Sequence, residues 1–69
     1  MIRRDLYAVK EWENGFGWQF VYVCRTLITA QRLQRCLGPI LGFSHKTKLV
    51  HPSQDVVDLY VLCGNEIYE

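Results

Sequence analysis

An Asn-Gly pair at positions 14 and 15 is the feature that most constrains the fold of this chain. It lies between two runs rich in strand-forming residues, 6–12 and 16–23. A type I′ turn needs positive φ angles at both central residues, and Asn and Gly adopt them readily. This turn also matches the twist of paired strands. The pattern therefore predicts a β-hairpin over residues 5–25.

A two-residue turn would fix the register of this hairpin, with Val9 facing Phe20 and Tyr7 facing Tyr22. Side chains alternate between the two faces of a strand, so this register sorts the hairpin into two unlike faces. One face is aliphatic and is expected to pack against a helix. It carries Leu6, Ala8, Val21 and Val23. The other face is aromatic and carries Tyr7, Val9, Trp18, Phe20 and Tyr22.

Residues 26–43 have the apolar spacing of a helix. Thr29 is a candidate N-cap, and Thr26 is the alternative that starts the helix earlier. Gly38-Pro39 is expected to end or kink the helix, because proline lacks an amide hydrogen and clashes with the preceding turn. Residues 40–43 would then lie against the core as a short irregular tail. The apolar stripe consists of Leu33, Leu37, Ile40 and Leu41, with Ala30 and Cys36 beside it.

Two further strands are predicted at residues 48–51 and 55–63, after a polar loop at 44–48 and joined by residues 52–54. The predicted fold class is α+β with the order ββαββ, in a single domain over residues 1–69. It has one sheet of about four strands, mostly antiparallel, with one helix on one face. A single helix cannot cover both faces, so the far face is exposed or covered by a partner.

The aromatic face is the first candidate binding surface. Exposed apolar patches mark interaction sites, and Trp and Tyr dominate binding hot spots. Two alternatives stay open: the tail residues Phe43 or 67–68 cover this face, or the aromatics form the core and the aliphatic face is open. The candidate residues are Tyr7, Trp18, Phe20 and Tyr22, with Tyr60 if the last strand packs in the same sense.

Charge is segregated along the chain, although the net charge is only +1. No Asp or Glu occurs between Asn14 and Gln54, whereas four acidic residues follow from Asp55 onwards. The basic middle section is a candidate patch that would steer a partner. The alternative is an ordinary solvated helix face balanced by acids elsewhere. The patch residues are Arg25, Arg32, Arg35, Lys46 and Lys48.

Aromatics on a sheet beside basic residues are also typical of single-stranded nucleic-acid binding. The chain lacks the RNP1 signature of RNA-recognition sheets, and its net charge is close to neutral. The four C-terminal carboxylates would repel a phosphate backbone. Nucleic-acid binding is therefore the alternative to binding a protein.

Catalytic and metal-binding patterns are weak. No phosphate loop or nucleophile-elbow string occurs, so no catalytic residue and no cofactor is predicted. Cys24, Cys36 and Cys63 form no C-x-x-C pair and are predicted to be buried thiols. A disulfide or a zinc site with His45 and His51 is the alternative. A grouping of Cys63 with His51 and Asp58 would require an accessible thiol.

These patterns predict a non-enzymatic module that docks its aromatic face onto a protein partner or a second copy of itself. A compact chain of this kind suits an inhibitor, an adaptor or a small regulatory subunit. Small proteins of this kind are frequent in phages and other mobile elements. No apolar run is long enough to span a membrane, and no apolar signal core follows the charged N-terminus. The predicted location is therefore cytoplasmic, with no membrane partner.

Overall fold

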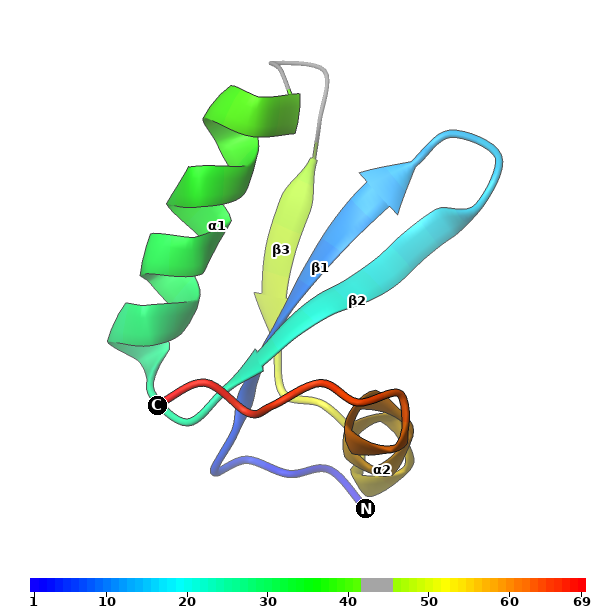
Figure 1. The fold of residues 1–69 in the computed structure, drawn as a ribbon, viewed down its shortest axis with the longest axis vertical. Coiled ribbons are helices and arrows are strands. Elements are labelled where there is room, and N and C mark those ends of the chain that lie inside the picture. The colour runs from blue at the N-terminus through cyan, green and yellow to red at the C-terminus, as the bar shows by residue number, and fades with distance from the viewer. Residues whose placement is uncertain (42–45) are drawn as a thin grey trace.

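The computed structural model describes residues 1–41 and 46–69 as a small α+β fold (Figure 1). It has a three-stranded antiparallel sheet with the order β2-β1-β3, so β1 is the central strand. The α+β class is confirmed, but the predicted four strands and single helix are replaced by three strands and two helices. The elements are β1 (Tyr7–Glu13), β2 (Gly17–Cys24), α1 (Leu27–Leu41), β3 (Thr47–Val50) and α2 (Gln54–Leu62).

Helix α1 starts where the alternative cap predicted. The hydroxyl oxygen of Thr26 accepts a hydrogen bond from the Thr29 backbone amide at 3.3 Å, which satisfies one of the free amides of the first turn. The helix then continues through Gly38-Pro39 to Leu41 instead of ending there. A proline near the C-terminal end of a helix removes only one backbone hydrogen bond. The predicted tail at 40–43 and the loop at 44–48 fall partly on residues 42–45, outside the described residues.

Helix α2 occupies the segment that alternation had predicted as the last strand. Ser53 is its N-cap, with the hydroxyl oxygen accepting from the Val56 amide at 3.3 Å. Val57 and Tyr60, one helical turn apart, are the buried residues of this helix. Valines favour strands, but burial against other elements overrides so weak a preference. The other C-terminal strand is close to its predicted place, at Thr47–Val50.

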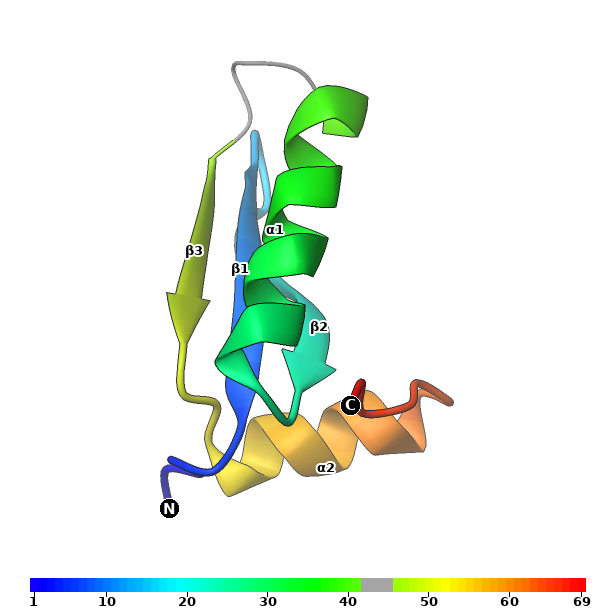
Figure 2. The same ribbon diagram turned by 90° about the vertical axis from the view of Figure 1, so that its left-hand side faces the viewer.

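The core has two parts, one on each face of the sheet. Helix α1 covers one face along its length, whereas α2 crosses beneath the opposite end of the sheet from the hairpin turn (Figure 2). On the α1 side, Val9, Cys24, Ala30 and Leu37 form one buried cluster. On the α2 side, the buried cluster consists of Leu6, Ala8, Val23, Val57 and Tyr60. Of the two helices in residues 1–41 and 46–69, neither covers the half of the α2 side that lies nearer the hairpin turn (Figures 1 and 2).

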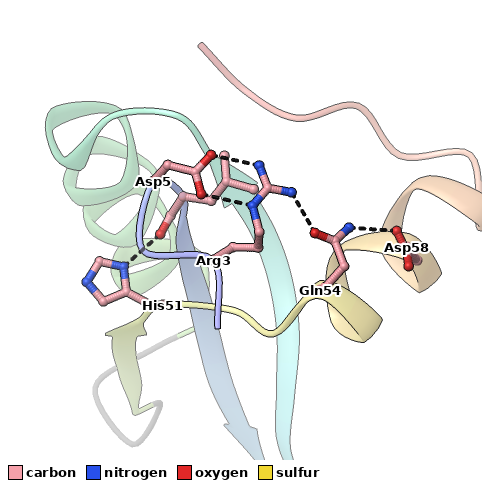
Figure 3. Close-up of polar contacts among 6 residues, drawn as sticks. Arg3, Asp5, His51, Gln54 and Asp58 are labelled. Carbon is pink, nitrogen blue, oxygen red and sulfur yellow. Dashed lines mark hydrogen bonds and ion pairs between the residues drawn. The ribbon is translucent and has the colours of Figure 1, made fainter. Parts of the chain in front are cut away.

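Polar contacts fasten the N-terminal segment to α2 (Figure 3). The Arg3 guanidinium donates to both carboxylate oxygens of Asp5, at 2.9 and 2.7 Å, and to the Gln54 side-chain oxygen at 2.8 Å. Gln54 in turn donates to Asp58 at 2.8 Å. The hydrogen bond from Arg3 lowers the pKa of the Asp5 carboxyl. These contacts hold α2 in place across the end of the sheet.

The C-terminal segment adds a short parallel bridge to β2. Tyr68 bridges Cys24, its amide donates to the Val23 carbonyl at 2.9 Å, and its carbonyl accepts from the Arg25 amide at 2.7 Å. The Thr29 hydroxyl donates to the Glu69 backbone carbonyl. The outer edge of β2 is therefore covered beside Cys24. In the described ranges, no helix is long and apolar enough to cross a bilayer.

Candidate docking surface

A bulge in β2 decides which aromatic rings share a face of the sheet. Val9 pairs with Tyr22, but the next residue, Lys10, pairs with Phe20, so Val21 is an extra residue without a partner in β1. One extra residue reverses the alternation of side chains on either side of it. Tyr22 therefore packs toward α1, whereas Phe20 lies on the other face.

The hairpin turn also differs from the predicted type I′ turn. Glu13 pairs with Gly17, so three residues form the loop, and the Phe16 amide donates to the Glu13 carbonyl at 3.1 Å. Gly15 has a φ of 92°, but Asn14 does not have the positive φ that a type I′ turn requires. The longer loop shifts the register by one residue, and Trp12 pairs with Trp18 as a result.

The predicted division into an aromatic and an aliphatic face is therefore wrong. Tyr7 and Tyr22 pack against the α1-side cluster. Tyr60 lies on α2, with only 8% of its surface exposed, and not on a strand. The aliphatic residues Leu6, Ala8 and Val23 are buried under α2 instead of α1. Of the predicted rings, only Trp18 and Phe20 lie on the strand surface of the α2 side, which α2 covers in part.

Five residues on this face form what we call the docking face. The Lys10 ammonium nitrogen lies 4.8 Å from the centroid of the Phe20 ring, and the Lys48 nitrogen lies 4.2 Å from that of the Trp18 ring. The Trp12 and Trp18 rings meet edge to face at 5.6 Å. Trp12 and Phe20 are 39% and 37% exposed. The docking face consists of Lys10, Trp12, Trp18, Phe20 and Lys48.

Positive charge extends along the edge of the docking face. The Trp12 amide donates to the Lys46 carbonyl at 2.9 Å, which continues the ladder between β1 and β3. Strand alternation then places Lys46 on the same face as Lys48, and places Glu11 and Glu13 on the α1 side. Among the described strand residues, the docking face thus carries lysines and no carboxylate.

The predicted basic patch is not contiguous. Arg32 and Arg35 are exposed on α1, across the sheet from Lys48. Arg25 lies at the end of β2, where its Nε is 3.4 Å from a Glu69 carboxylate oxygen. Sequence reasoning found Lys46 and Lys48 but missed Lys10 and Trp12. Alternation alone would have placed these two beside Phe20, had a three-residue turn been assumed.

A half-open groove of about 260 Å³ lies between β2 and α2, and we call it the α2 groove. The Tyr60 hydroxyl donates to the Glu66 carbonyl at 3.0 Å, and the Asn65 side chain donates to the Tyr60 carbonyl at 3.2 Å. These bonds hold one end of the groove, and burial raises the pKa of the Tyr60 hydroxyl. The lining is mostly apolar: Phe20, Val56, Leu59, Tyr60, Cys63 and Asn65.

The three cysteines are free thiols, but the prediction that all three are buried is wrong. Cys24 is buried, and burial raises the pKa of its thiol, whereas Cys36 and Cys63 are exposed. Within residues 1–41 and 46–69, no group of three or more metal-ligating side chains occurs, and His45 lies outside those ranges. Two residues of the grouping considered with Cys63 make other contacts. His51 contacts the Leu6 carbonyl, and Asp58 accepts a hydrogen bond from Gln54 (Figure 3).

Comparison with known proteins gave no relative. No family model matches the chain, and no match was found among curated proteins or among solved structures. The function is therefore inferred from the docking face and the α2 groove.

Proposed function

We propose that this chain is a small non-enzymatic binding module that docks onto a protein partner. The contact surface is the docking face together with the α2 groove. The observation that supports this proposal is the position of Phe20, which is part of the docking face and also lines the groove. One partner segment can therefore touch the aromatic and aliphatic groups that form the core of a protein interface and the lysines that form its polar rim.

The ring contacts favour a protein over a nucleic acid. Bases stack on ring faces that are open, but ammonium groups lie over the Trp18 and Phe20 rings. A stacking base would have to displace Lys10 or Lys48. The groove walls formed by Val56 and Leu59 are aliphatic and suit an apolar side chain rather than a sugar-phosphate chain.

The charge of the face favours a different chain over a second copy as the partner. A two-fold dimer built on the docking face would bring the same surface of both copies together. Lys10, Lys46 and Lys48 would then meet their own counterparts, and like charges across an interface are unfavourable. A partner that carries carboxylates satisfies the same lysines.

Photo-crosslinking tests this function. A photoreactive phenylalanine replaces Trp12 on the docking face, and the protein is irradiated in nuclease-treated lysate of the organism that encodes it. The matched control carries the same group at Ile28, an exposed position on α1. We expect a discrete polypeptide adduct from position 12 that disappears when Phe20→Ala is added. The control should give no such adduct.

Two results would overturn the proposal. One is the absence of any adduct that is specific to position 12. The other comes from a parallel irradiation in untreated lysate: an adduct that forms only there and is digested by nuclease would assign the docking face to a nucleic acid.

A further inference from the structure

We infer that the α2 groove is an anchor pocket for one bulky apolar side chain of an acidic partner segment, whose carboxylates lie on Lys10 and Lys48. This inference rests on the proposed function and specifies the partner's chemistry. It combines the groove, the lysine pair beside it and the exposed apolar rim of α2.

The size of the groove suits a side chain rather than a complete ligand. Its volume of about 260 Å³ lies below the range of roughly 300–1,000 Å³ found for pockets that hold drug-sized molecules. The walls are mostly apolar, and burying an apolar surface against them contributes roughly 25 cal/mol per Å². A single Leu, Met, Phe or Trp side chain matches this space and chemistry.

The lysine pair indicates an anionic occupant. Lys10 and Lys48 are directly opposite each other in the β1–β3 ladder. Directly opposed like charges destabilise a sheet, so this pair has a cost in the free domain that a bound carboxylate would remove. The Lys10 nitrogen also lies 4.8 Å from the Phe20 ring, which is a wall of the groove. A carboxylate within a few residues of the anchor can therefore reach it.

The rim of the groove adds apolar contact area. Leu59 is 61% exposed although it lines the groove, and Leu62 on the same helix is also exposed. A partner that covers these leucines removes their apolar surface from water, and this burial favours binding. The exposed leucines thus lie on α2, while the lysines lie on the sheet on the other side of Phe20.

Selection from a library of random 12-residue peptides, displayed against the immobilised domain, tests the inference. We expect the enriched peptides to contain a bulky apolar residue with Asp or Glu within about three positions of it. A synthetic peptide of the consensus should bind at least tenfold more weakly to Leu59→Lys and to Lys10→Gln/Lys48→Gln. The control Ile28→Lys, on the exposed side of α1, should bind it as the wild type does. Circular dichroism verifies that every variant is folded.

The outcomes separate the two proposals. Peptides that depend on Leu59 but carry no acidic residue, and bind the lysine variant unchanged, would overturn the inference and leave a protein-docking function standing. If no peptide is enriched on the wild type relative to Leu59→Lys, the anchor pocket is wrong. The crosslinking from position 12 then decides independently whether the docking face binds a protein.

Discussion

The Lys10 ammonium lies 4.8 Å from the centroid of the Phe20 ring, and the two residues are direct cross-strand partners in β1 and β2. Cation–π contacts at partly exposed sites contribute about 0.5–1 kcal/mol. The contact holds a positive charge beside a ring that also forms a wall of the α2 groove. This juxtaposition of cationic and apolar groups is the basis of both proposals.

Removal of the Phe20 ring should affect binding and stability together. Phe20→Ala is expected to abolish binding of the selected peptide and to lower the free energy of unfolding by about 1–2 kcal/mol, less than a fully buried Phe→Ala change. The measurements are peptide titration and urea unfolding. Phe16→Ala is the control: that ring is 73% exposed in the turn, so unfolding should change by less than about 0.5 kcal/mol. Equal effects of the two variants would contradict the role of Phe20.

Loss of positive charge on the docking face should weaken binding, whereas loss of charge on α1 should not. Lys10→Gln/Lys48→Gln is expected to raise the dissociation constant for the selected acidic peptide at least tenfold and to flatten its salt dependence. The matched variant Arg32→Gln/Arg35→Gln removes the same charge from the other side of the sheet. The two variants are compared by titration at low and high salt. A larger loss in the arginine variant would move the binding surface to α1.

Alkylation of Cys63 should block the groove. N-ethylmaleimide is expected to react in the native domain with the exposed Cys36 and Cys63 but not with the buried Cys24. In a Cys36→Ser background, alkylation at Cys63 should reduce peptide binding at least tenfold. A Cys63→Ser variant alkylated at Cys36 should keep full binding. Mass spectrometry identifies the modified thiol, and unchanged binding after complete reaction of Cys63 would count against an anchor in the groove.

The cap of α2 should contribute measurably to stability. Ser53→Ala removes the acceptor for the Val56 amide and is expected to lower the free energy of unfolding by about 1 kcal/mol. Ser53→Asp supplies an alternative acceptor and a negative charge at the helix N-terminus, so it should retain most of the stability. Urea unfolding monitored by circular dichroism compares the three proteins. An alanine variant as stable as the wild type would contradict this role for Ser53.

Stability should fall at alkaline pH. Burial raises the pKa values of the Tyr60 hydroxyl and the Cys24 thiol, so the unfolded chain releases these protons at lower pH than the folded chain does. Their contribution is complete below about pH 8, where both groups are protonated in the unfolded chain as well, and is lost as the pH rises toward the folded-state values. Urea unfolding between about pH 8 and pH 10.5 measures the slope. Tyr60→Phe and Cys24→Ala should each show a shallower decline, and a stability that rises with pH would contradict the assignment.

Local sequence signals predicted the hairpin, the first helix and the strand at Thr47–Val50, because each depends on residues close together in the chain. The Asn-Gly pair marks a reversal, and the leucine spacing of α1 has a helical period. The same signals identified Trp18, Phe20 and Lys48 of the docking face. Signals of this kind act through backbone geometry within a few residues, and they do not require knowledge of what packs against them.

Tertiary structure decided the rest. The bulge at Val21 places Tyr22 on the face that α1 covers and Phe20 on the opposite face. The valine-rich segment from Gln54 to Leu62 is a helix because this conformation packs Val57 and Tyr60 against Leu6 and Ala8. Burial against distant elements contributes more free energy than local strand preference. The sequence therefore determined where the chain turns, and long-range packing determined which side chains were left to form a surface.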